Sequence, residues 1–168
     1  MAAGGTTDVL GIPVPSTDPT FLALVVVHIG FGIAAVASGA IAMLSSKGRG
    51  RHANFGTLYF WSICGLAVTM SVLSFLRWAE DYHLFVLGAL AFALVHFARR
   101  AIRARRPRWH LAGMGLSYVV MLTAFYVDNG KNLPVWRDLP HIAYWIAPAA
   151  VGVPLIAYYL VRLPAFKR

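Results

Sequence analysis

The stretch Phe21–Leu44, FLALVVVHIGFGIAAVASGAIAML, contains no Lys, Arg, Asp or Glu. A helix of about 17 to 25 mostly apolar residues is long enough to cross the hydrocarbon core of a bilayer. A lone apolar span satisfies its backbone hydrogen bonds in lipid only as a helix. We therefore expect an all-α integral membrane bundle of five transmembrane helices, because four more stretches qualify: 53–76, 82–98, 111–127 and 141–161.

The composition excludes the usual soluble classes. Hydrophobic residues make up 59% of the chain and charged residues 12%, whereas soluble domains are about 45–50% apolar and about 25% charged. One cysteine, Cys64, excludes an intramolecular disulfide framework. We expect three parts: a flexible extracytoplasmic head (1–20), a single transmembrane domain (21–161) and a basic tail (162–168).

The charged residues are distributed by side. Twelve of the fifteen Lys and Arg residues fall in the first connection (45–51), the third connection (99–108) and the tail. All six acidic residues fall in the head, the second connection (78–81) and the fourth connection (128–140). Because cytoplasmic loops carry the Lys and Arg excess, this pattern predicts an N-terminus outside and a C-terminus in the cytoplasm. We expect a multi-pass protein of the bacterial cytoplasmic membrane.

The third connection holds the densest run of arginine. We expect it to contact the headgroups of anionic phospholipids in the bilayer, since each basic residue near such a surface contributes about 1 kcal/mol. A phosphorylated or otherwise anionic partner is the alternative. Nucleic acid is not expected, because no interleaved aromatic platform accompanies the run. The basic positions are Arg99, Arg100, Arg103, Arg105, Arg106 and Arg108.

Six histidines are the candidate functional residues. Ionisable groups inside membrane spans are costly and by default suggest function. The predicted topology places His28, His83 and His141 in the outer half and His52, His96 and His110 in the inner half. Helical spacing aligns four of these rings with small residues, which pack between membrane helices, so we expect these four to point into the bundle: His28, His96, His110 and His141.

Several roles remain open for these rings. Paired histidines can hold haem, and a haem b-binding electron-transfer protein is the main alternative to a protein without a cofactor. His83 and His96 lie on one predicted helix, an arrangement similar to membrane b-type cytochromes. Their spacing of 13 residues leaves the two side chains about 140° apart. A small metal site is a further alternative, built from His28, His83 and His141 with Asp81 or Asp128.

Two other interpretations concern proton chemistry and packing. A small proton-linked transporter would use His28 as its buried ionisable group, with Pro148 and Pro154 bending the fifth span. In the simpler interpretation, the buried histidines hydrogen-bond to a Ser, a Tyr or a carbonyl between helices. Ser117 and Tyr118 are supporting polar candidates for a site.

Three motifs resemble a known family. They are Lys47-Gly48…Arg51-His52…Gly56…Tyr59, then Arg108-Trp109-His110…Met114…Ser117-Tyr118, and finally the segment Tyr126–Pro134, YVDNGKNLP. Together they resemble small bacterial multi-helix membrane proteins of unknown function, over roughly residues 20–160. The resemblance implies an inner-membrane helical bundle and supplies no reaction.

No P-loop, GxGxxG, HExxH, CxxC or GxSxG motif occurs, and no internal repeat is evident. We therefore favour a non-enzymatic membrane protein whose biochemical role the sequence leaves open. A homo-oligomer or an unidentified membrane partner is compatible with the sequence.

Overall fold

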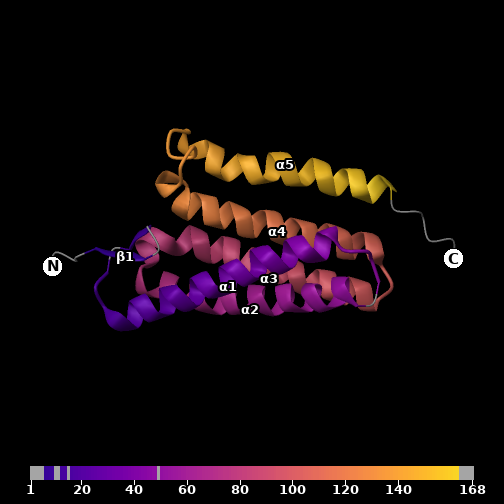
Figure 1. Cartoon of the computed structure of the whole chain (residues 1–168), viewed down its shortest axis with the longest axis horizontal. Helices are drawn as coiled ribbons and strands as arrows, with labels where there is room; N and C mark the ends of the chain where they lie inside the picture. Colours follow the sequence, from indigo (N-terminus) through magenta and orange to yellow (C-terminus); the bar gives the residue numbers. More distant parts are fainter. Residues whose placement is uncertain (1–5, 10–11, 15, 49, 163–168) are drawn as a thin grey trace. The chain divides into compact units, whose positions relative to one another are not determined.

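The computed structural model describes residues 6–9, 12–14, 16–48 and 50–162 (Figure 1). Arg49 and most of the predicted tail lie outside the described residues. All five predicted helices are present, and each is long and apolar enough to cross a membrane. The all-α fold class is confirmed. The helices are α1 (Pro19–Leu44), α2 (Arg51–Leu76), α3 (Trp78–Arg103), α4 (Pro107–Asn129) and α5 (His141–Arg162), with a short 3-10 helix, η1 (Gly130–Asn132), after α4.

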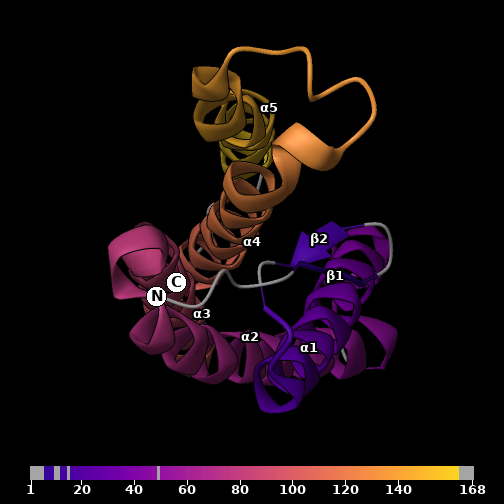
Figure 2. The ribbon, with the colours of Figure 1, turned by 90° about the vertical axis from the view of Figure 1, so that its left-hand side faces the viewer.

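The chain forms two compact units, residues 1–85 and residues 86–168. The first unit contains the head, α1, α2 and the start of α3, and in it α1 packs along α2 (Figure 2). The second unit contains the rest of α3 followed by α4, η1 and α5, and in it α4 packs along α5. In each unit, consecutive antiparallel helices make the main contact.

The start of α1 is fixed by Asp18 and Pro19. The Asp18 carboxylate accepts hydrogen bonds from the backbone N–H groups of Thr20 at 2.7 Å and Phe21 at 3.2 Å. These bonds satisfy amides that have no partner inside the helix. Proline fits the first helical position because it has no N–H to satisfy. The Phe21 and Thr20 amides hold the pKa of the Asp18 carboxyl below its ordinary value, because they stabilise its charged form.

Two predicted connections are shorter than the sequence suggested. The segments Trp78–Asp81 and Arg99–Arg103, predicted as parts of loops, are helical parts of α3. Glu80 and Asp81 lie in the first turn of α3, and the arginines lie in its last turns. The helix dipole favours acids at the start of a helix and bases at its end, so these charges extend α3. Only Arg77 separates α2 from α3, and its side chain pairs with Glu80.

Helix α5 runs through both of its prolines. Pro148 and Pro154 lie inside the helix from His141 to Arg162. Proline lacks an N–H, so each removes one helical hydrogen bond. Pro148 is buried, as is Tyr144 one turn earlier, whereas most other side chains of α5 are exposed or half-buried within the chain.

The head contains two short strands. Strands β1 (Thr7–Val9) and β2 (Ile12–Val14) pair antiparallel, with Thr7 opposite Val14 and Val9 opposite Ile12. The sequence predicted a flexible head, and it gave no prediction of these strands. The β-branched residues in both segments suit a pleated pair.

The outward faces of the helices are apolar. Large side chains such as Val68 on α2, Val86 on α3 and Val151 on α5 are each more than half exposed. Water would penalise so much exposed apolar surface, whereas lipid tails would not. The small buried core instead consists of residues between helices, among them Tyr59 and Ile63.

Candidate functional site

The first unit holds a buried histidine contact between α1 and α2. The His28 Nδ1 atom lies 2.7 Å from the Thr69 hydroxyl oxygen. Thr69 is buried, and its hydroxyl also lies 2.8 Å from the Gly65 carbonyl oxygen one turn earlier in α2. When the hydroxyl donates to Gly65, it accepts from the His28 N–H. The sequence correctly placed His28 towards a neighbouring helix, but it did not identify Thr69 as the partner.

A second contact joins the same two helices next to their turn. The His52 Nδ1 atom lies 2.8 Å from the carbonyl oxygen of Ala42, in the last turn of α1. A carbonyl only accepts, so this nitrogen carries the proton and donates it. Lys47 Nζ donates to the carbonyl of Met43 at 2.7 Å and lies 3.4 Å from that of Ala42. Burial lowers the pKa of the Lys47 ammonium from its ordinary value.

The second unit repeats this type of contact between α3 and α4. The His110 Nδ1 atom lies 3.1 Å from the carbonyl oxygen of Ala98. The two helices approach closely one turn further on, at Gly113. A Cβ atom at Gly113 would lie 2.8 Å from the Ala98 Cβ and 3.1 Å from the Leu94 carbonyl oxygen. Glycine is therefore required there by the contact between the two backbones.

The other three histidines make different contacts. His96 Nδ1 donates to the carbonyl of Phe92 in its own helix at 3.0 Å, so it does not join two helices by this bond. His83 lies edge-on to its neighbour Tyr82, and His141 lies edge-on to Tyr144. His141 is exposed, so the prediction that it points into the bundle is wrong. It is the first residue of α5 and lies before the helix reaches its buried positions.

The predicted metal site has no assembled ligand set in the part of the chain that the structure describes. No group of three or more His, Cys, Asp or Glu side chains there is close enough to hold one metal ion. The supporting polar residues predicted from the sequence make local contacts instead. The backbone carbonyl of Asp81 accepts from Ser74, Ser117 donates to the Met114 carbonyl, and the Asp128 carboxylate accepts from Asn129. Tyr118 is half-buried on α4.

Most of the buried hydroxyl groups bond to their own helices, whereas Ser74 of α2 donates to the Asp81 carbonyl of α3. The others donate to a carbonyl three or four residues earlier, as Ser62 does to Leu58 at 2.9 Å and Thr123 does to Val119 at 3.0 Å. Ser38 and Ser71 make the same bond. This local pairing satisfies hydroxyl groups without a partner helix. Thr69 is different because its hydroxyl also contacts His28.

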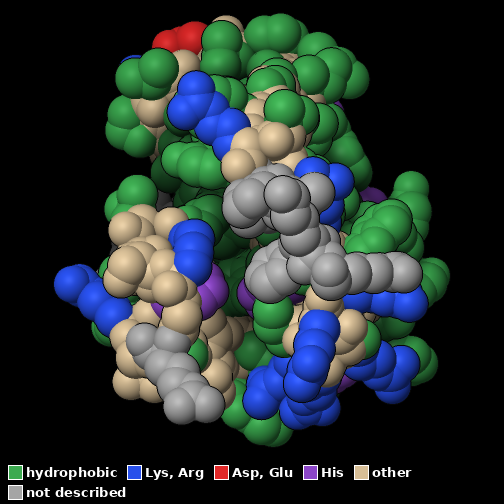
Figure 3. Space-filling view, turned by 90° about the vertical axis from the view of Figure 1, so that its right-hand side faces the viewer, with side chains coloured by type: hydrophobic (Ala, Val, Ile, Leu, Met, Phe, Trp, Pro, Cys, Tyr) green, Lys and Arg blue, Asp and Glu red, His purple; other side chains and the backbone are tan. Residues whose placement is uncertain are grey.

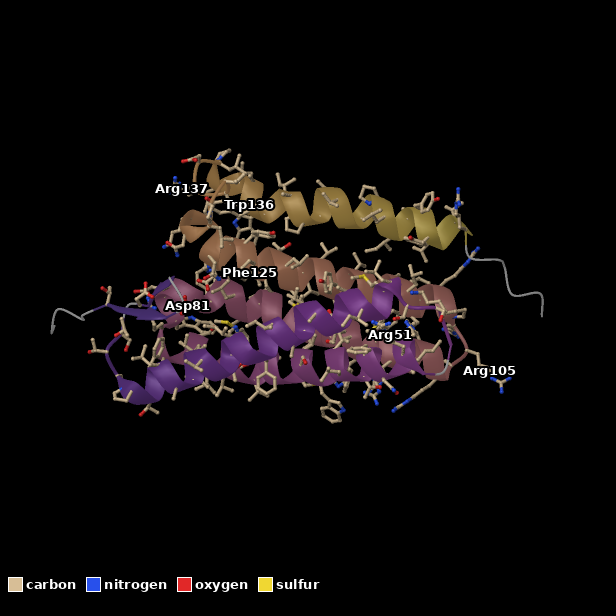
Figure 4. The ribbon with its side chains drawn as sticks, viewed as in Figure 1. Arg51, Asp81, Arg105, Phe125, Trp136 and Arg137 are labelled. Atoms are coloured by element: carbon tan, nitrogen blue, oxygen red, sulfur yellow. The ribbon has the colours of Figure 1, made fainter. Side chains whose placement is uncertain are left out.

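The arginine run lies at the turn between α3 and α4. Arg106 N–H bonds to the Ala101 carbonyl and Arg105 N–H to that of Ile102, the pattern of a Schellman turn. Arg105 occupies the left-handed position, with φ of 56°, where glycine is usual. Figure 4 shows Arg105 at this end of α4, with Trp136 and Arg137 at the opposite end. The six predicted positions are Arg99 (half-buried) and Arg100, Arg103, Arg105, Arg106 and Arg108 (exposed).

Both turns are basic. The first basic turn, residues 45–50, leads into Arg51, and the second basic turn is Ala104–Arg106. In the space-filling view, Lys and Arg side chains are prominent and few Asp or Glu side chains are visible (Figure 3). An anion approaching either turn therefore meets several positive charges.

An aromatic cluster closes the other end of the second unit. The rings of Tyr126 and Trp136 stack with centroids 4.1 Å apart, and the Tyr144 hydroxyl donates to the Trp136 carbonyl at 3.1 Å. A Cβ at Gly130 would collide with the Tyr144 ring. Val135 beside this cluster has φ of 72°, a strained conformation for a β-branched residue. The sequence suggested a turn here but not this packing.

The fold and these contacts define a multi-pass helical membrane protein. A family model for predicted membrane proteins, DUF2306, matches residues 25–160. The chain belongs to this family, whose function is unknown, and the resemblance seen in the sequence is confirmed. Neither the curated proteins nor the solved structures contain a match to the chain.

Proposed function

We propose that this chain is a multi-pass protein of the bacterial cytoplasmic membrane, with its head outside, its tail in the cytoplasm and both basic turns at the inner surface. The observation that carries this proposal is the sided distribution of charge over five spans. If each helix crosses the membrane once, the turns after α1 and α3 face the same side. The segments around these turns, 45–51 and 99–108, together with the tail, hold twelve of the fifteen Lys and Arg residues, as cytoplasmic segments do.

The orientation is tested with two fusions at the C-terminus. A fluorescent protein that matures only in the cytoplasm should give a bright signal, and alkaline phosphatase, which is active only outside, should be inactive. Fusions after Asn132, in the connection before α5, are the matched control and should give the opposite result. Phosphatase activity at the C-terminus would overturn the proposed orientation.

We further propose that the two basic turns bind the headgroups of anionic phospholipids. Exposed guanidinium groups at the second basic turn match phosphate in charge and geometry, because arginine can bind two phosphate oxygens at once. Neighbouring Trp109 is more than half exposed, and tryptophan is enriched at the membrane interface. Arg105 has the left-handed backbone conformation that glycine adopts more easily. The presence of an arginine at this position supports a role for its charge.

Lipid binding is tested by native mass spectrometry of the protein released from nanodiscs that contain phosphatidylglycerol and phosphatidylcholine. The protein should retain phosphatidylglycerol in preference. Neutralising Arg105, Arg106 and Arg108 to Gln should reduce the retained anionic lipid several-fold, whereas Arg137→Gln, at the opposite end of α4, should not. Equal retention of both lipids by the unaltered protein would refute this part of the proposal.

A further inference from the structure

We infer that α1–α2 and α3–α4 are two copies of one helical hairpin. Each hairpin is closed beside its turn by a histidine that donates Nδ1–H to the preceding helix. The acceptors are the backbone carbonyls of Ala42 for His52 and Ala98 for His110. This inference does not depend on lipid binding or on orientation. The sequence showed no internal repeat, because the copies share contact positions and few residue identities.

The first helix of each copy presents the same buried positions. Ala42 and Ala98, which supply the acceptor carbonyls, are buried, with 6% and 0% of their surface exposed. Seven residues earlier, Ala35 and Ala91 are also buried, with 0% and 4% exposed. Residues seven apart share one face of a helix. Each of these helices therefore places two alanines, two turns apart, on the face that meets the next helix.

The second helix of each copy also matches when counted from its histidine. Tyr59 and Ser117 lie seven residues after the histidine and are buried. Ile63 and Met121 lie eleven residues after it and are buried as well. His52 and His110 thus begin a face that continues into the interior of the protein. Helix α5, which packs on α4, lies outside the repeat.

The bonds of these two histidines perform a distinct task. Ala42 lies among the last residues of α1, whose carbonyls lack a partner within the helix. Ala98 lies deeper in α3, where the carbonyl oxygen can accept a second bond. In both copies, the bond spans the turn and limits separation of the two helices at that end. His96 is a natural control, because its Nδ1 bonds within its own helix.

The test compares replacements that distinguish the two ring nitrogens. The side-chain amide nitrogen of Asn lies near the position of Nδ1, that of Gln lies near Nε2, and Leu has no donor. Hydrogen–deuterium exchange of the protein in nanodiscs is measured for peptides that cover 41–56 and 96–114. His52→Leu and His52→Gln should accelerate exchange about fivefold in 41–56 only, and His52→Asn should remain within twofold of the unaltered protein.

The same three replacements at His110 should act on 96–114 only, and His96→Leu should leave the amides around both turns unchanged. The inference is overturned if Asn behaves like Leu at both positions, because the Nδ1 bond would then contribute nothing. It is also overturned if Gln preserves protection and Asn does not, since that result would assign the role to Nε2. Acceleration in the peptide of the other hairpin would contradict two separately closed copies.

Discussion

The turns of the two hairpins reverse the chain by different means. The first basic turn uses glycine where the backbone needs positive φ, at Gly48 (137°) and Gly50 (96°), and the Lys47 side chain covers the carbonyls at the end of α1. The second basic turn places Arg105 in the left-handed region and closes with backbone bonds. A non-glycine residue there costs on the order of 1 kcal/mol. Similar histidine-to-carbonyl hydrogen bonds therefore form beside two turns of different backbone conformation.

The largest change in stability is expected where α3 and α4 pack closely in the second hairpin. Gly113→Ala should destabilise the protein by about 2 to 3 kcal/mol, because the new methyl group would be forced against Ala98 and the Leu94 backbone. Gly56→Ala on α2 is the matched control, since a methyl group there would meet no neighbouring side chain or helix within 4 Å. The control should be neutral or stabilising. Thermal unfolding in detergent measures both, and equal melting temperatures would contradict the close contact between α3 and α4.

The next effect concerns the buried contact between His28 and Thr69 in the first hairpin. His28→Leu and Thr69→Val should each destabilise the protein, and their coupling in a double-mutant cycle should be about 1 kcal/mol. Interhelical hydrogen bonds in membranes average somewhat less than this. Ser71→Ala is the control because its hydroxyl bonds only within its own helix. A coupling energy near zero would show that the His28–Thr69 bond contributes nothing to stability.

The smallest effect is expected when glycine is introduced into the second turn and removed from the first. Arg105→Gly should stabilise the protein by up to about 1 kcal/mol through relief of the left-handed strain. Gly48→Ala should destabilise the first turn by a similar amount, because its φ of 137° is unfavourable for alanine. Both changes are measured as shifts in the unfolding midpoint in one detergent. Destabilisation by Arg105→Gly would mean that the arginine side chain contributes more than its backbone conformation costs.

The sequence predicted the number and class of the helices but not the contacts between them. An uninterrupted apolar run such as Phe21–Leu44 leaves few alternatives to a membrane span. The ends of α3 were missed because Glu80 and Arg103 were interpreted as loop residues, although each charge suits its end of the helix dipole. Such charges do not by themselves mark where a helix ends.

The histidine partners could not be predicted for a different reason. Two of them are backbone carbonyls, at Ala42 and Ala98, and every residue offers a carbonyl. Thr69 becomes the partner of His28 only once the register between α1 and α2 is known. Hydrophobic spacing alone does not fix that register. The positive φ angles of Val135 and Arg105 could not be predicted either, because neither valine nor arginine is typical of that conformation.

Side-specific labelling of single cysteines tests whether the chain crosses the membrane five times with both basic turns on one side. With Cys64 replaced by Ser, cysteines at Ser46 and Ala104 report the two turns, and one at Asn132 reports the other side. A membrane-impermeant maleimide should label positions 46 and 104 only in inverted vesicles and position 132 only in intact cells. Labelling of positions 46 and 104 from opposite sides of the membrane would contradict this topology.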